Sequence, residues 1–97
     1  MTITSLLDMH FAAAHLEDGP RALLDILADT RAFKGCLGVQ VVTDVSDPAH
    51  VIAVEHWESL EHDEAYRAWR AGPGASGLGD YLAGPPALTR FTNVVSL

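Results

Sequence analysis

The order of strand-like and helix-like segments constrains the fold of this chain most. Four segments are rich in apolar and β-favouring residues, and two segments between them carry apolar residues at helical spacing. The expected strands cover residues 3–11, 36–45, 50–58 and 86–97, and the expected helices cover residues 20–34 and 60–71. The order is therefore strand, helix, strand, strand, helix, strand. It predicts an α+β fold of the ferredoxin-like βαββαβ kind, an antiparallel sheet with both helices on one face.

The two predicted helices are amphipathic and have recognisable ends. In the first, Leu23, Ile26, Leu27 and Thr30 recur at intervals of three and four, and the Gly35 that follows is typical of a helix C-terminus. Ser59 is a suitable N-cap for the second helix. Along that helix the apolar stripe includes Tyr66 and Trp69, and the run Gly72-Pro73-Gly74 ends it. Residues 46–49 have the composition of a turn between the two central strands.

The chain length indicates a single domain spanning residues 1–97. A domain of this size has a thin core, so we expect a homodimer that buries the free sheet face, forming a dimeric α/β barrel. The net charge of −7 argues against nucleic-acid binding and against docking on an anionic membrane. A lone Cys36 and the lack of a signal-like segment predict a cytoplasmic protein, and the preference for arginine over lysine suggests a GC-rich bacterial source.

The five histidines do not have the spacing of a metal-binding motif. His10 and His15 are separated by an odd interval, so they would face opposite sides of one strand. His50, His56 and His62 share a six-residue spacing, but they span a strand and the start of a helix. No two histidines lie four residues apart as on a zinc-binding helix. We therefore expect no metal site. The parity of His10 is opposite to that of Met9, which places it on the face expected at the dimer interface.

The third predicted strand carries the candidate chemistry. Alternation places Val51, Ala53, Glu55 and Trp57 on one face, and if this face meets the helices, Glu55 and Trp57 line a cavity below Tyr66 and Trp69. Indole N–H groups and a phenol can donate hydrogen bonds to a substrate oxyanion and stack on an aromatic ring. Both tryptophans could equally fill the core.

Glu55 lies in an otherwise apolar run, so burial would raise its pKa into the range of a useful base. Two other readings stay open for this carboxylate. It could pair with Arg67 or Arg90, or it could lie in water at the sheet edge.

Three stretches carry a family resemblance: residues 33–40 (Phe-Lys-Gly-Cys-Leu-Gly-Val-Gln), residues 54–59 (Val-Glu-His-Trp-Glu-Ser) and residues 65–69 (Ala-Tyr-Arg-Ala-Trp). With this element order, the chain resembles the antibiotic biosynthesis monooxygenase family of small dimeric α+β barrels. The Trp-Glu-Ser that leads from a strand into a helix is the most specific element. Members of that family include cofactor-free oxygenases that convert anthrone-type polyketides to quinones, and heme-degrading monooxygenases.

The resemblance implies a cofactor-independent monooxygenase that takes a small aromatic, polyketide-like substrate and molecular oxygen. It implies catalytic roles for Trp57 and Tyr66, and the position of Glu55 in its apolar run adds this carboxylate as the third candidate catalytic residue. Substrate contacts would come from Trp69, Ala53, Leu78 and Leu7. The alternatives are a non-oxidative cyclase or isomerase of similar substrates and a non-enzymatic dimer that binds a small ligand.

The sequence also departs from the family patterns. Ala53 stands where the quinone-forming members have an asparagine four residues before the tryptophan. Heme-degrading members have an iron-ligating histidine where this chain has Gly77-Leu78-Gly79, and an asparagine where it has Leu6-Leu7-Asp8. Without the axial histidine, heme degradation is the less favoured reaction.

Overall fold

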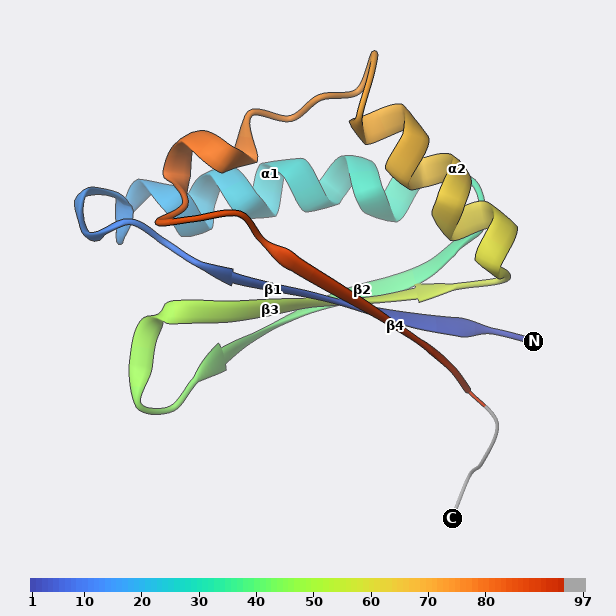
Figure 1. Cartoon of the computed structure of the whole chain (residues 1–97), viewed down its shortest axis with the longest axis horizontal. Helices are drawn as coiled ribbons and strands as arrows, with labels where there is room; N and C mark the ends of the chain where they lie inside the picture. The colour runs from blue at the N-terminus through green and yellow to red at the C-terminus, as the bar shows by residue number, and fades with distance from the viewer. Residues whose placement is uncertain (94–97) are drawn as a thin grey trace.

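The computed structural model describes residues 1–93. Its regular elements follow the predicted order (Figure 1). The strands and helices are β1 (Ile3–His10), α1 (Asp18–Ala32), β2 (Cys36–Asp44), β3 (Asp47–Trp57), α2 (Leu60–Arg70) and β4 (Ala87–Thr92), with short 3-10 helices at Ala13–His15 and Leu78–Tyr81. Of the strand predicted over residues 86–97, residues 94–97 lie outside the described part of the chain.

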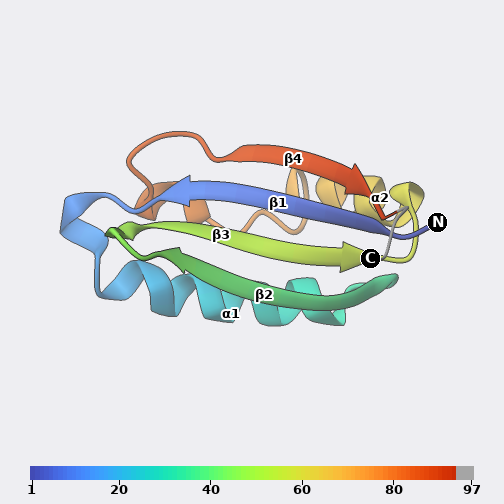
Figure 2. The same cartoon turned by 90° about the horizontal axis from the view of Figure 1, so that it is seen from below.

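The strands form one antiparallel sheet in the order β2-β3-β1-β4. Both helices cover the same face of it, and Figure 2 shows the strands in front with the helices behind them. The predicted α+β, ferredoxin-like arrangement is therefore confirmed. None of the helices in residues 1–93 is long and apolar enough to cross a membrane.

The pairing of β1 with β3 organises the core. On the face toward the helices, Ile3 lies opposite Trp57, and Met9 lies opposite Val51. Two apolar clusters form at these two ends, one around Trp57 and Tyr66 and the other around Met9 and Leu27. Between the two clusters, Ser5 lies opposite Glu55, and both side chains are buried. A polar pair thus divides the inner face of the sheet.

The helices begin and end near the predicted positions. α1 starts at Asp18, two residues before Pro20. Pro20 fits in this first turn because the backbone N–H groups there have no intrahelical partner, so the N–H that proline lacks is not needed. Gly19 lets α1 approach β1 closely, since a Cβ there would lie 2.5 Å from the Phe11 ring. In α2 the predicted cap is present, and Ser59 Oγ accepts the backbone N–H of His62 at 3.3 Å.

The β2–β3 hairpin is tighter than predicted. The sequence indicated a turn over residues 46–49, but Asp44 pairs with Asp47, so only Val45 and Ser46 form the turn. Asp44 Oδ1 accepts the N–H of Ser46 at 2.8 Å and closes the turn locally. Pro48 lies within β3, in the irregular stretch where the pairing with β2 shifts register. The β2–β3 pairing therefore does not need the backbone N–H that proline lacks.

Within residues 1–93, no helix covers the opposite face of the sheet, here called the outer face (Figure 2). Strand alternation places a group of apolar side chains there, and Val42 and Phe91 are about half exposed, at 47% and 49%. The apolar members of the outer face are Leu6, Val42, Ile52, Val54 and Phe91.

Candidate functional site

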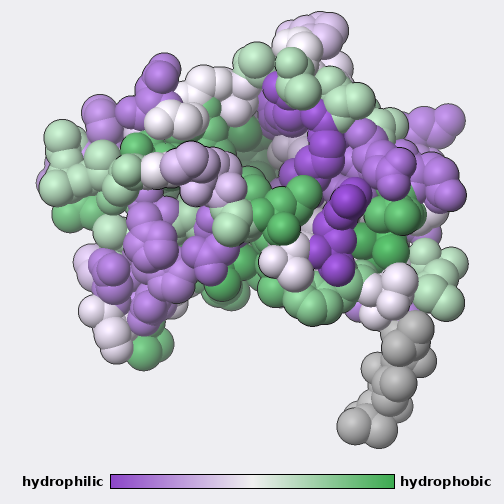
Figure 3. Space-filling model, in the orientation of Figure 1, coloured by the Kyte–Doolittle hydropathy of each residue, from purple (hydrophilic) through white to green (hydrophobic). Residues whose placement is uncertain are grey.

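A cavity of about 320 Å³ lies between the sheet and the two helices. Its floor includes Leu7 and Glu55, and the loop of residues 75–79 closes one side. Figure 3, which has the orientation of Figure 1, shows hydrophobic side chains in the recessed centre of the molecular surface, with hydrophilic ones beside them. α1 contributes Leu23, Ile26 and Leu27 to the wall, and α2 contributes Tyr66, Arg67 and Arg70. The cavity is therefore largely apolar with charged groups at one side.

Glu55 is the carboxylate of this cavity, and its side chain is only 1% exposed. Its Oε1 atom accepts a hydrogen bond from Arg67 Nη2 and another from Trp57 Nε1 at 3.2 Å. Burial raises the pKa of Glu55, and the nearby Arg67 charge offsets only part of this effect. The ion pair with Arg67 is one of the readings that the sequence left open.

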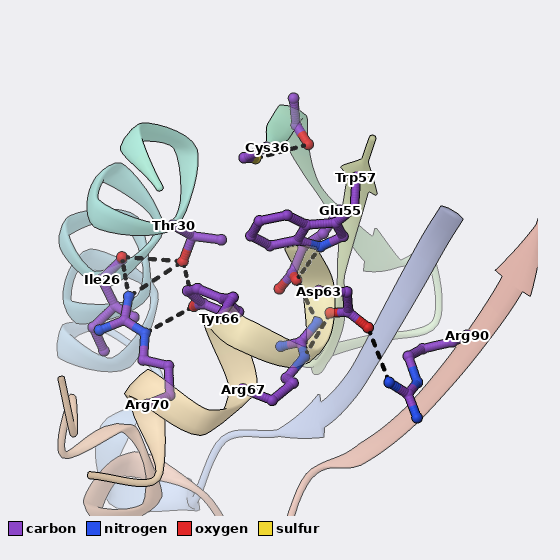
Figure 4. A network of polar contacts seen from close by, with 11 residues as sticks. Ile26, Thr30, Cys36, Glu55, Trp57, Asp63, Tyr66, Arg67, Arg70 and Arg90 are labelled. Atoms are coloured by element: carbon purple, nitrogen blue, oxygen red, sulfur yellow. Dashed lines mark hydrogen bonds and ion pairs between the residues drawn. The ribbon is translucent and has the colours of Figure 1, made fainter. Parts of the chain in front are cut away.

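Arg67 also belongs to a longer chain of charges (Figure 4). Its Nε atom donates to Asp63 Oδ1 at 2.9 Å, and Arg90 Nη1 lies 3.3 Å from Asp63 Oδ2. Asp63 is fully buried, one helical turn before Arg67 on α2, while Arg90 comes from β4. Two carboxylates and two guanidinium groups alternate, so the buried charges compensate one another.

A second network holds Tyr66 in place. The Tyr66 hydroxyl accepts from Arg70 Nε at 2.8 Å and lies 2.6 Å from Thr30 Oγ1. Arg70 also donates to the backbone carbonyls of Ile26 and Gly74, so it ties α2 to α1 and to the loop that follows α2. The Tyr66 hydroxyl is thus already hydrogen-bonded within the protein.

The structure brings four of the predicted site residues together at the cavity: Leu7, Glu55, Tyr66 and Leu78. The other three are not among the residues that line it. Ala53 is completely buried in the core, and Trp57 is completely buried between Phe33, Tyr66 and Ile3. Trp69 borders an adjoining groove. The expectation that the two indoles enclose the cavity is therefore corrected, although their catalytic and binding roles stay predictions.

Local packing explains where the indoles lie. The Trp57 ring packs at 5.0 Å from Tyr66 and edge-on to Phe33 at 6.2 Å, which fills the space below the end of α2. Trp69 packs flat on the backbone of Gly74, where a Cβ would lie 2.2 Å from the indole. The Arg70 guanidinium covers the Trp69 ring at 4.6 Å. Both rings contribute to packing around the cavity.

Sequence reasoning missed the roles of Asp63 and Arg70. Asp63 lies in the first turn of α2, and its spacing of four from Arg67 was the available signal for a buried ion pair. It also missed a cluster on the outer face, where Asp8, His10 and His50 offer ligand atoms within 4.8 Å of one another. The signal was the strand register, which places His10 directly opposite His50.

Comparison with known structures supports the fold. A candidate antibiotic biosynthesis monooxygenase from Deinococcus radiodurans is similar at a TM-score of 0.81 and 23% identity, covering 100% of this chain and 96% of its own. Another from Nitrosomonas europaea gives a TM-score of 0.79 at 12% identity, covering 98% and 100%. A third, from Chloroflexus aurantiacus, gives 0.76 at 16%, covering 100% and 97%. At these identities the likeness shows the fold alone.

Comparison of the sequence with family models identifies the family. No curated protein gave a significant match to the sequence. The family model described as "antibiotic biosynthesis monooxygenase" matches residues 3–76, from the start of β1 through α2 to the loop that closes the cavity. The matched region includes both members of the ion pair at the cavity, Glu55 and Arg67. This chain belongs to the antibiotic biosynthesis monooxygenase family.

Proposed function

We propose that the cavity binds a small aromatic, polyketide-like phenol or anthrone and that the protein oxidises it to a quinone with molecular oxygen and no cofactor. The observation that carries the proposal is Glu55, a buried carboxylate with a raised pKa in the floor of an apolar cavity. A volume of about 320 Å³ suits a small ligand. Family membership supports the reaction class.

The proposed reaction begins with proton transfer. Glu55 removes a proton from the substrate methylene, and the resulting carbanion passes one electron to O₂. The carbon radical and superoxide then join to form a C–O bond. The peroxide takes the proton back and eliminates water, which leaves a carbonyl. Overall, one CH₂ group and one O₂ give one C=O group and one H₂O.

The hydrogen bonds of the site support a separate proposed role for each group. Glu55 Oε1 is occupied by Arg67 and Trp57, while Oε2 has no hydrogen-bond partner within residues 1–93, so Oε2 is the proposed proton acceptor. Arg67 lines the cavity, and its Nη1 atom is likewise without a hydrogen-bond partner in that range, so Nη1 is the proposed donor to the substrate oxyanion. Trp57 acts through Glu55, as a positioning residue.

A non-oxidative reaction, cyclisation or isomerisation, is the second candidate. The observation that favours it is the contact between Glu55 and Arg67, because a base beside an oxyanion donor can move a proton without oxygen. A dimer that only binds a small ligand would need neither group.

The test is turnover of an anthrone by the purified protein, followed by oxygen consumption and quinone absorbance. We expect Glu55→Gln to lower kcat by on the order of 10²–10⁴. Glu58→Gln is the matched control, because Glu58 is an exposed carboxylate that lies just after β3. Proton exchange or rearrangement of the anthrone without oxygen uptake would favour the second candidate. Binding without any turnover would reject both enzymatic functions.

We also propose that the protein is a homodimer that buries the outer face against a second copy. The outer face is apolar, and no helix from the described part of the chain covers it; its apolar residues include Leu6, Val42, Ile52, Val54 and Phe91. A domain of this size gains stability from burying such a face. The pairing of equivalent faces about a twofold axis is the usual closed solution.

A further inference from the structure

A histidine–aspartate cluster lies on the outer face of the sheet, on the other side from the cavity. His10 of β1 and His50 of β3 are direct cross-strand partners, and Asp8 lies two residues before His10 on the same face. One ligand atom from each of these side chains lies within 4.8 Å of the other two. Asp8 and His50 are half-buried, whereas His10 is exposed. The cluster is independent of the proposed function of the cavity.

His50 holds the central position, because each of its ring nitrogens faces a carboxylate. Nε2 lies 2.8 Å from Asp8 Oδ1, and Nδ1 lies 2.8 Å from Asp44 Oδ2. A carboxylate oxygen only accepts hydrogen bonds, so both ring nitrogens must carry protons when no other cation is present. A divalent metal ion bound between Nε2 and Asp8 would replace one of those protons and supply the positive charge that faces the two carboxylates.

Asp44 supplies the contact that a metal-binding histidine ordinarily has on its other nitrogen. With Nδ1–H donating to Asp44, the ring is fixed in the tautomer that leaves Nε2 free to bind a cation. This carboxylate comes from β2, so three neighbouring strands contribute to the arrangement. The orientation is built into the sheet.

His10 offers the third ligand atom of the cluster. Its ring is stacked on that of His50, with centroids 4.3 Å apart and planes 4° from parallel. The lone pair of an imidazole lies in the ring plane, so the His10 ring must tilt to aim a nitrogen at an ion held by His50. His10 is exposed in the single chain and lies at the end of β1, beyond the apolar residues proposed to meet the second copy, so this rotation gives up only its stacking on His50.

We propose that Asp8, His10 and His50 bind one divalent transition-metal ion of the Zn²⁺ type, oriented by Asp44. Two imidazoles and one carboxylate suit Zn²⁺, Co²⁺ or Ni²⁺ better than Mg²⁺ or Ca²⁺, which prefer oxygen ligands. Water completes the coordination.

The test is calorimetric titration of the full chain with Zn²⁺, and with Co²⁺ followed by its visible absorption. We expect saturation at one ion per chain and no response to Mg²⁺. His50→Ala and His10→Ala should each weaken Zn²⁺ binding at least about tenfold, and Asp44→Asn should weaken it about 10–100-fold through ring orientation. His15→Ala is the matched control, because His15 also contacts a carboxylate, Asp18, at 3.1 Å.

Three results would overturn the proposal. The first is the absence of binding up to millimolar Zn²⁺, which would leave His50 as a protonated bridge between two carboxylates. The second is unchanged binding in folded His10→Ala and His50→Ala proteins, as judged by circular dichroism. The third is one ion per two chains, since the three ligands assigned here belong to a single chain. Because His10 is exposed, its variant keeps the test valid if His50→Ala fails to fold.

Discussion

Trp57 donates its indole N–H to Oε1 of Glu55 at 3.2 Å, and the two side chains lie two residues apart on the same face of β3. The hydrogen bond joins a completely buried ring to the carboxylate of the cavity floor. Packing around the indole therefore fixes the position of the acid, although the indole itself does not line the cavity. This arrangement gives Trp57 an indirect effect on any chemistry of Glu55.

Replacing Trp57 with phenylalanine keeps an aromatic ring and removes the donor. The charged form of Glu55 loses a hydrogen bond, so we expect its pKa to rise further and the acidic limb of the pH–rate profile to move to higher pH. We also expect a loss of on the order of 1–2 kcal/mol in the free energy of unfolding in urea. Trp69→Phe is the control, and an identical shift in that variant would contradict the assignment.

The pKa of Glu55 also predicts how stability depends on pH. Because burial raises this pKa above its ordinary value of 4.5, the folded protein binds a proton more tightly than the unfolded chain does. The contribution of Glu55 is therefore fully present below pH 4.5 and is lost as the pH rises through the folded-state pKa.

Glu55→Gln removes this dependence, so its stability relative to the natural protein should increase with pH across that window. Unfolding in urea at a series of pH values measures the difference. Comparison of the two proteins cancels the opposite contributions of Asp44 and Glu61, whose pKa values are lowered by hydrogen bonds. A difference that stays constant with pH would show that Glu55 titrates as it does in water.

Gly74→Ala should disturb the contact between the loop after α2 and Trp69. A Cβ at this position would lie 2.2 Å from the indole, so the ring or the loop must move. We expect a destabilisation of about 1–3 kcal/mol, as for other overpacked sites, and a change in tryptophan fluorescence. Gly79→Ala is the matched control in the same loop region, because a Cβ there meets no atom within 4 Å. Equal effects of the two substitutions would contradict this reading.

A charge on the outer face should dissociate the proposed homodimer. Val54 lies on the central strand β3, opposite Leu6, so Val54→Lys places an ammonium group in the centre of the apolar face. We expect the mass measured by sedimentation to fall to that of one chain. Val45→Lys, at the fully exposed hairpin turn, should leave the mass unchanged. A natural protein that sediments as a single chain would refute the dimer.

The fold was predictable because several independent sequence signals agree. Helical spacing, the Ser59 cap and strand alternation all led to the observed element order and to the inward face of β3. The tight hairpin was not predicted, because Pro48 normally marks a turn and here lies in a bulged stretch of strand.

The site was only partly predictable. Strand parity correctly placed Glu55 toward the helices, but parity cannot tell whether a large side chain lines a cavity or fills the space beside it. Trp57 fills that space because Phe33 and Tyr66 converge on it from two other elements. The position of His10 beside His50 likewise depends on the register between strands forty residues apart, which spacing along the chain does not contain.

The alignment of β1 against β3 that buries Glu55 opposite Ser5 is also the alignment that sets His10 opposite His50 on the other side. A shift of the whole β1–β3 register by one residue would exchange the two sides of β3, because successive side chains point in opposite directions. The carboxylate would leave the apolar floor in the same event that separates the two imidazoles. Such a shift would therefore remove the proposed cavity site and the proposed ion site together, whereas point substitutions can remove them one at a time.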